Sequence, residues 1–254
     1  MKRLIVNADD FGRAHGVNAG ILRAYRDGIV TATTMMVSAP GSAEAGSIAR
    51  ATPSLDVGVH LTLTYGRPVS DPQAIRSLVE PGGAFPRVPG AFVGTGRAAR
   101  EEALVEYRAQ WARAGDLIGR PPSHLDSHHW LHDDPAMEWA IVALARETAL
   151  PVRPHDDAQR DRLRAAGVHT VDHYRRDFQH EGHVDIATLE RILANLNDGV
   201  TELGCHPGEA DAELARTSTY AALRVDELAT LTDPRIKLAV ARDAITLADY
   251  TVLR

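Results

Sequence analysis

The sequence predicts an α/β fold: a single domain, residues 1–254, built as a distorted (β/α) barrel similar to a TIM barrel. Three observations lead to this class. The chain has 254 residues, of which 44% are hydrophobic, and this is enough for one large core. Segments of strand and helix character alternate along it. Several polar residues follow directly after predicted strands, the place where barrel proteins carry their functional side chains.

The first part of the chain alternates between strands and helices. Residues 4–7 are apolar enough for a buried strand, and apolar residues recur at helical spacing over 17–25 until Gly28 ends the run. Residues 31–38 and 56–63 have strand character, with an alanine-rich helical stretch between them. This βαβαβ order implies parallel strands, because each helix returns the chain to the end of the sheet from which it came.

The remainder continues the alternation after one long irregular segment. Residues 66–96 contain repeated glycine and proline, so we predict a loop insertion that serves as a lid or as a contact between two subunits. Further helices are predicted at 97–118, 135–147, 185–196 and 219–231, and further strands at 123–127, 151–154, 201–206 and 236–240. Six or seven strand–helix units without an internal repeat indicate an irregular barrel.

The bulk composition limits the classes of function. A net charge of -6 and a pI of about 6.0 provide no basic surface for nucleic acid. Neither a signal peptide nor an apolar run of the ~20 residues needed to cross a bilayer is visible, so we expect a soluble, cytoplasmic protein without a membrane partner. Cys205 is the only cysteine, which leaves histidines and carboxylates as ligands for any metal.

Two adjacent carboxylates end the first predicted strand, and a histidine interrupts the third. Asp9 and Asp10 lie in the sequence NADDFG, and at a strand-to-loop bend both side chains can reach one cavity. They can equally cap the next helix, whose amino end favours negative charge. His60 lies in the apolar stretch GVHLTLT, where a buried imidazole is either hydrogen-bonded in the core or used in function.

The segment 123–132, SHLDSHHWLH, is the strongest signal in the chain. It holds four of the 12 histidines, and His124, Asp126 and His128 alternate so that they share one face of a strand. Imidazole and carboxylate together suit Zn²⁺, Mn²⁺, Co²⁺ or Fe²⁺, while Asp126 can instead orient a ligand histidine. On spacing alone, His124, His128 or His129 can be the histidine that binds a metal.

A histidine and an arginine also lie at the ends of predicted strands. His206 precedes a Pro-Gly turn that fixes its backbone at the mouth of the barrel, as acid–base catalysis requires, although an ordinary turn histidine fits the same pattern. Arg153 lies between two prolines. It can pair with Asp9 or Asp10 and lower the pKa of that carboxyl, or it can lie on the surface.

The four motifs NADDFG, GVHLTLT, SHLDSHHWLH and CHPG occur in this order and span nearly the whole chain. Together they resemble the motifs of the YdjC-like carbohydrate deacetylase family. That family includes chitooligosaccharide deacetylases and is distantly similar to the NodB-type polysaccharide deacetylases.

The resemblance implies a distorted (β/α) barrel that binds one divalent metal ion, magnesium or zinc before manganese or cobalt. The ligands would be Asp10, His60 and His128, with Asp9 as the general base and His206 as the general acid. The reaction would be hydrolysis of N-acetyl groups on amino sugars or oligosaccharides of the N-acetylglucosamine class, with water activated by the metal.

Aromatic residues adjoin these motifs. Phe11, Tyr65 and Trp130 stand beside the predicted site residues and can stack on sugar rings, although packing in the core is the alternative.

Two other functions stay open beside the deacetylase. A metal-dependent phosphoesterase or amidohydrolase uses similar residues at strand ends, but the sequence has no P-loop and no cluster of lysine or arginine near the histidines to hold phosphate. A non-catalytic sugar-binding protein has no need of a base and an acid such as Asp9 and His206. We expect a small carbohydrate as the partner, no nucleic acid, and a homodimer as one use of the segment 66–96.

Overall fold

The centre of the structure is a sheet whose strands are all parallel. The computed structural model describes residues 1–253, apart from the side chains of residues 89, 213 and 217. Within this part the strands are β1 (Lys2–Phe11), β2 (Ala32–Met35), β3 (Asp56–Leu61), β4 (Leu125–Ser127), β5 (His173–Arg175), β6 (Gly199–Cys205) and β7 (Thr246–Leu247). They lie in the order β4-β3-β2-β1-β6-β5, and β7 pairs with the first residues of β1.

In the described part of the chain β4 and β5 are the two ends of this order, so the curled sheet forms an incomplete barrel. The predicted α/β class with a distorted barrel is confirmed. Since all strands are parallel, their carboxyl ends meet at one edge of the sheet, and the polar motifs found in the sequence meet there too.

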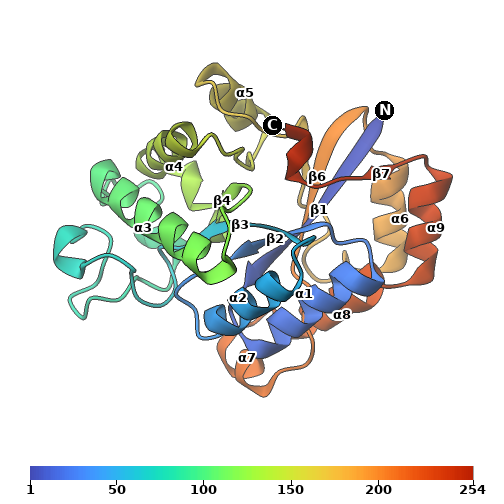
Figure 1. Ribbon diagram of the computed structural model, residues 1–254, viewed down its shortest axis with the longest axis horizontal. Helices are drawn as coiled ribbons and strands as arrows, with labels where there is room; N and C mark the ends of the chain where they lie inside the picture. Colours follow the sequence, from blue (N-terminus) through green and yellow to red (C-terminus); the bar gives the residue numbers. More distant parts are fainter. Residues whose placement is uncertain (254) are drawn as a thin grey trace.

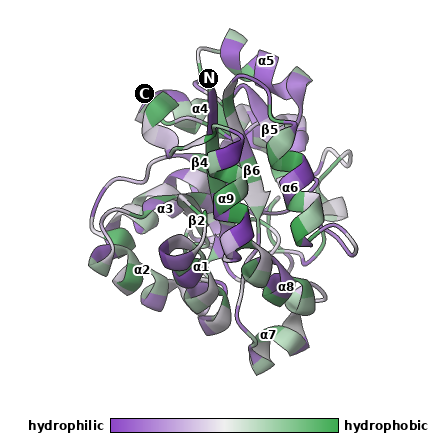
Figure 2. Ribbon diagram, turned by 90° about the vertical axis from the view of Figure 1, so that its right-hand side faces the viewer, coloured by the Kyte–Doolittle hydropathy of each residue, from purple (hydrophilic) through white to green (hydrophobic). Residues whose placement is uncertain are grey.

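Helices surround the sheet. They are α1 (His15–Asp27), α2 (Ser42–Ala51), α3 (Arg100–Ile118), α4 (Pro135–Thr148), α5 (Asp157–Ala165), α6 (Ile186–Ala194), α7 (Ala212–Thr217), α8 (Ala221–Leu231) and α9 (Pro234–Arg242), with short 3-10 helices η1 (Pro72–Ala74), η2 (Pro89–Ala91), η3 (His128–Asp133) and η4 (Tyr250–Leu253). Figure 1 shows α3 and α4 on one side of the strands and α6 and α9 on the opposite side. In Figure 2, α6 and α9 mix hydrophobic and hydrophilic residues, as expected of helices that cover a sheet with one face. None of the described helices is long and apolar enough to cross a membrane.

Aspartates begin four of the helices. The side chains of Asp134, Asp156, Asp185 and Asp233 each accept a hydrogen bond from a backbone N–H in the first turn of α4, α5, α6 and α9. A proline follows the capping aspartate in α4 and α9, where its fixed φ suits the first turn. At the other end, α3 stops at Gly119, which has the left-handed φ of 73°. Local sequence signals therefore set these helix boundaries.

The structure corrects two predicted strands. Residues 236–240 belong to α9, because Asp233 caps a helix there and apolar residues at helical spacing form its buried face. Within 151–154, only Val152 forms a parallel bridge, to Leu125, so this segment extends the edge of β4 without being a strand of its own. Four further elements, α5, β5, α7 and β7, were not predicted from the sequence.

The glycine- and proline-rich segment 66–96 packs against α3. The backbone N–H groups of Val69 and Ser70 donate to the buried carboxylate of Glu106 at 3.0 and 2.9 Å. Phe92 is fully buried in the main hydrophobic core. A loop anchored in this way is part of the domain, and its service as a lid or subunit contact stays a prediction.

Candidate metal centre

A bulge at the end of β1 turns two neighbouring carboxylates toward the same cavity. Between its pairs with Thr33 and Met35 of β2, strand β1 has two residues, Asp9 and Asp10, where β2 has only Thr34. Asp10 has a φ of 71°, in the left-handed region that aspartate adopts more readily than most residues. Adjacent side chains of a regular strand point to opposite faces, so the bulge is what lets both carboxylates line one cavity.

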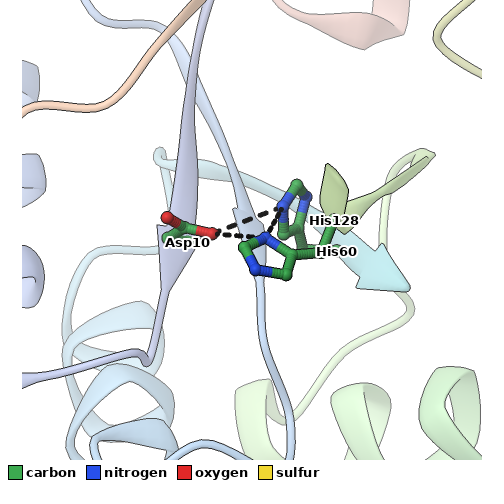
Figure 3. Close-up of side chains that lie close together, drawn as sticks. All are labelled: Asp10, His60 and His128. Atoms are coloured by element: carbon green, nitrogen blue, oxygen red, sulfur yellow. Dashed lines mark hydrogen bonds and ion pairs between the residues drawn. The ribbon is translucent and has the colours of Figure 1, made fainter. Parts of the chain in front are cut away.

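Asp10, His60 and His128 bring three possible ligand atoms together at one point (Figure 3). Oδ1 of Asp10 lies 3.4 Å from Nε2 of His60 and 3.1 Å from Nδ1 of His128, and the two ring nitrogens are 3.3 Å apart. All three side chains are buried, and they come from β1, from β3 and from the residue that follows β4. These are the residues that the family resemblance implied as metal ligands.

The chemistry of this group suits a cation. Oδ1 of Asp10 is buried and faces only the ring nitrogens of His60 and His128, without a hydrogen bond of good geometry in the described part of the chain, so a cation between the three atoms would satisfy it. Burial opposes charge on His60, but the carboxylates of Asp126, Asp10 and Asp9 outweigh it and raise the pKa of His60 to about 10. The field that holds a proton on this ring favours a metal cation in the same place.

Asp126 holds the ring of His60. These two residues pair across β3 and β4, and Oδ1 of Asp126 lies 2.7 Å from Nδ1 of His60. The hydroxyl of Thr34 donates to the other oxygen of Asp126 at 2.9 Å. A carboxylate at Nδ1 keeps the proton on that nitrogen and leaves the lone pair of Nε2 directed at Asp10 and His128. Asp126 therefore supports a candidate ligand from behind.

Arg153 is buried behind the site and binds the carboxylates there. Two of its N–H groups donate to the two oxygens of Asp9, each at 2.7 Å, so the pairing suggested by the sequence is present. Its Nε donates to Glu202 at 2.6 Å, and Nη1 lies 2.8 Å from Asp126. Although burial acts in the opposite direction, the guanidinium holds the pKa of Asp9 well below its usual range. Burial raises the pKa of Glu202 to about 7.

A second group, Asp9, His60 and Asp126, is also close enough to share a cation. Arg153 already donates to Asp9 and lies within ion-pair distance of Asp126, so positive charge is present there. Arg224 pairs only with Oδ2 of Asp10, so Oδ1 of Asp10 stays directed at His60 and His128.

His206 follows β6 and faces Asp9. Its Nε2 lies 3.8 Å from Oδ2 of Asp9. Its backbone N–H donates to Glu227 of α8, which also accepts a hydrogen bond from the hydroxyl of Tyr220 at 2.6 Å. Burial lowers the pKa of His206 to about 4, so the ring is neutral at neutral pH, and burial raises the pKa of Glu227 to about 7.

These side chains line a cavity of about 600 Å³. Tyr65 and Trp130, two of the residues predicted to stack on sugar rings, belong to its wall. Phe11 does not: its side chain is fully buried in the hydrophobic core and is not part of the cavity lining. Packing, the alternative interpretation, explains Phe11.

Three arginines, Arg13, Arg87 and Arg224, line the same cavity. Arg224 pairs with Oδ2 of Asp10, and the guanidinium of Arg13 lies 4.8 Å from the centre of the Tyr65 ring. The expectation that no arginine cluster accompanies the histidines is wrong, because the fold gathers these residues from separate segments.

Sequence reasoning also missed Tyr220, Arg224 and Glu227 as a group. Their spacing of four and three residues, which places them on one face of a helix, was the signal that could have revealed them.

His124 and His129 have other contacts than the metal group. Nδ1 of His124 lies 2.7 Å from the hydroxyl of Ser123 and Nε2 lies 3.0 Å from Oδ1 of Asn7, so both ring nitrogens are engaged. Nδ1 of His129 lies 3.0 Å from the hydroxyl of Thr64, outside the metal group, and the His129 ring stacks on His128 with centres 3.8 Å apart. The two alternatives left open by spacing therefore do not join the group, and His128 does.

Fold and site together define an α/β protein with a candidate centre of two histidines and one aspartate at the carboxyl ends of parallel strands. Comparison with known proteins identifies it further. The chain belongs to the family described as YdjC-like protein, whose model matches residues 3–242, so the resemblance seen in the motifs is confirmed.

Individual relatives match over nearly their whole length. The chain is 40% identical over 250 residues to a carbohydrate deacetylase of Geobacillus stearothermophilus, with 97% of this chain and 96% of the relative covered. It is 34% identical over 252 residues to a chitooligosaccharide deacetylase of Serratia marcescens, with 98% of each covered. The crystal structure of a putative cellobiose-phosphate cleavage protein from Enterococcus faecalis V583 matches with a TM-score of 0.91 and 33% identity, over 99% of this chain and 98% of that one.

Proposed function

We propose that this protein is a metal-dependent carbohydrate deacetylase, which hydrolyses the N-acetyl group of an amino sugar in a small carbohydrate to acetate and a free amine. The observation that carries the proposal is the pair Asp9 and His206, a carboxylate and an imidazole 3.8 Å apart, beside the candidate metal ligands in one cavity. The activities named for the Geobacillus and Serratia relatives support the same reaction.

Asp10, His60 and His128 would hold the metal ion. Two imidazoles and one carboxylate suit zinc, manganese, cobalt or iron better than magnesium, which prefers oxygen ligands, so zinc is the first ion to test. When bound, the ion would supply a Lewis acid that polarises the acetyl carbonyl and favours loss of a proton from water.

Asp9 would accept the proton of the attacking water. Its Oδ1 accepts hydrogen bonds from both Asn7 and Arg153. Its Oδ2 accepts one from Arg153 and faces His206. We therefore assign the proton to Oδ2. Because Arg153 lowers the basicity of this carboxylate, Asp9 releases the proton again readily.

His206 would pass this proton to the leaving amine. A pKa of about 4 leaves the ring neutral at neutral pH, so it cannot donate at the start of the reaction. Oδ2 of Asp9 faces Nε2 of His206 at 3.8 Å, and the proton would pass between these two atoms once they come within hydrogen-bonding distance. The protonated ring then donates to the amine nitrogen as the C–N bond breaks, and the acetyl group leaves as acetate.

Trp130 and Tyr65 would contact the sugar. Aromatic rings have apolar faces that suit the apolar faces of sugar rings. Arg176 lies 4.6 Å from the centre of the Trp130 ring and His155 lies 4.8 Å from it, so neighbouring side chains hold the indole in the cavity wall. A cavity of about 600 Å³ lies within the usual range for small-molecule sites.

Acetate release from diacetylchitobiose tests the proposal, with purified protein loaded in turn with zinc, magnesium, manganese and cobalt. We expect release that depends on one metal ion per chain and is lost in Asp10→Ala together with metal binding. Asp9→Asn, which preserves shape, should keep the metal and lose turnover. Asp161→Asn on α5 is the matched control, since that carboxylate is 67% exposed and should not affect activity.

Two outcomes would contradict the proposal when the protein is folded and metal-loaded. Tight binding of acetylated sugars without acetate release would favour the non-catalytic sugar-binding protein. Hydrolysis of phosphate esters in place of acetamides, with two metal ions per chain, would favour the phosphoesterase.

A further inference from the structure

His124 lies behind the site rather than in it. Its side chain is fully buried and is not part of the cavity lining. The ring stacks on Tyr250 of η4, with centres 3.5 Å apart and planes 10° from parallel. Gly58 of β3 leaves room for it, since a Cβ at that position would lie 2.6 Å from the ring. This packing holds the imidazole in one orientation, so the directions of its two nitrogens are defined.

A chain of hydrogen bonds runs from His124 to the proposed base. Oγ of Ser123 lies 2.7 Å from Nδ1 of His124, and Nε2 of His124 lies 3.0 Å from Oδ1 of Asn7. Nδ2 of Asn7 in turn donates to Oδ1 of Asp9 at 2.8 Å. All four side chains are buried, so water does not compete for these bonds.

The donor and the acceptor of each hydrogen bond in this chain can be assigned by starting from Asp9. Asp9 accepts hydrogen bonds from Arg153 on both oxygens, so it is a carboxylate, and Asn7 must present its NH₂ group to it. The oxygen of the Asn7 amide then faces His124, which must carry its proton on Nε2. Nδ1 is left with a lone pair, to which the hydroxyl of Ser123 donates.

Thr34 supports the same orientation of the amide independently. Its hydroxyl proton is given to Asp126 at 2.9 Å, so toward Asn7 it can only accept. Nδ2 of Asn7 lies 3.3 Å from this oxygen, which is again a contact that only the NH₂ side of the amide can make.

We propose that His124 is a positioning residue, which acts through Asn7 to hold the donor of a hydrogen bond against Oδ1 of Asp9, and that it binds neither metal nor substrate. The proposal rests on the function proposed above, in which Asp9 is the base. By occupying Oδ1, the Asn7 amide directs the proton to Oδ2, the oxygen that faces His206. Without His124, the amide oxygen of Asn7 loses the N–H group that donates to it and stays buried without a hydrogen bond. The amide can then rotate, and its NH₂ group no longer has to face Asp9.

The first test reads the tautomer of His124 and does not depend on turnover. In the ¹⁵N spectrum of the imidazole rings of the intact protein, His124 should carry its proton on Nε2, both with and without zinc. The side-chain NH₂ of Asn7 should be protected from exchange with solvent, and in His124→Phe this protection should be lost. A proton on Nδ1, or a shift of either ring nitrogen on zinc addition that indicates coordination, would overturn the proposal.

The second test uses the kinetics of His124→Phe, which keeps a ring of similar size on Tyr250 and removes both nitrogens. Partners that orient a site residue from behind typically contribute 10–100-fold, so we expect kcat on diacetylchitobiose to fall by about that factor. KM and the zinc Kd should stay within about twofold. Ser123→Ala removes only one hydroxyl group and should disturb folding less. It should also lower kcat, by a smaller factor, and leave KM and the zinc Kd within about twofold.

A double-mutant cycle separates positioning from a merely structural effect. If His124 acts through Asn7, then kcat of Asn7→Ala with His124→Phe should equal that of Asn7→Ala alone. Additive losses would overturn the proposal, as would a raised KM or a weakened zinc Kd in His124→Phe. If the wild type releases no acetate, the proposed function is contradicted. The tautomer and exchange measurements then still test whether His124 positions Asn7.

Discussion

The most informative single change is Arg153→Met, which removes the positive charge behind the site and keeps an apolar side chain of comparable length. Arg153 is 1% exposed and lies within 2.8 Å of carboxylate oxygens of Asp9, Glu202 and Asp126. Removing one partner of a buried ion pair typically costs about 3–5 kcal/mol, because the remaining charges stay buried without compensation. In a domain of this size such a loss lowers Tm by roughly 6–20 °C.

The effect of pH on this loss has a definite sign. Arg153 holds the pKa of Asp9 below its usual range, so its contribution is present at neutral pH and is lost as pH falls. In Arg153→Met the buried carboxyls take up protons at a higher pH and then carry no charge. The difference in stability between the variant and the wild type should therefore be largest at pH 7 and shrink toward pH 4.

Urea unfolding of the metal-free proteins, followed by circular dichroism at pH 7 and pH 5, measures this difference. Arg108→Met is the matched control. Arg108 also binds a carboxylate with two N–H groups, that of Glu147, but the two side chains are 50% and 42% exposed. A surface pair of this kind contributes about 1 kcal/mol or less. Equal losses in the two variants, or a loss in Arg153→Met that does not depend on pH, would refute the reasoning.

Three further outcomes are expected. Burial raises the pKa of Glu227 from 4.5 to about 7, so this residue should contribute a loss of about 3 kcal/mol of stability as pH rises from 4.5 through 7. In urea titrations at pH 5 and pH 8, Glu227→Gln should therefore lose less stability than the wild type by about that amount. Zinc at 100 times its Kd should stabilise the protein by about 3 kcal/mol and raise Tm by roughly 5–10 °C in a thermal scan. A chelator should reverse this increase, and Asp10→Ala should not show it. Gly58→Ala should lower stability by about 1–3 kcal/mol, because the new Cβ would lie 2.6 Å from the ring of His124, and it should also lower kcat because it displaces that ring. An unchanged kcat would show that the position of His124 does not affect Asp9.

Much of the architecture could be predicted from the sequence. Apolar residues at helical spacing predicted most helices, and the βαβ order predicted a parallel sheet. Residues 236–240 show the limit of this reasoning. A short apolar run fits a strand or a helix equally well, and Asp233 followed by proline was the overlooked sign of a helix start.

The candidate site could be predicted for a related reason. Carboxyl ends of parallel strands meet at one edge, so side chains that follow strands in the sequence converge there even when the strands are far apart in the chain. Asp10, His60 and His128 meet in this way. The alternation of His124, Asp126 and His128 also placed them on one face, as their contacts with Asn7, His60 and Asp10 bear out.

Only the tertiary structure decided which of these side chains does what. The bulge that turns Asp9 and Asp10 to one cavity depends on how β1 pairs with β2, and Arg224 reaches Asp10 from 214 residues away. His124 and His128 look alike in the sequence, and they differ because Gly58 and Asn7 receive the first ring while Asp10 faces the second. Local spacing determines which face of an element a residue occupies, whereas its partner depends on sheet order and register, and these follow from the packing of the whole chain.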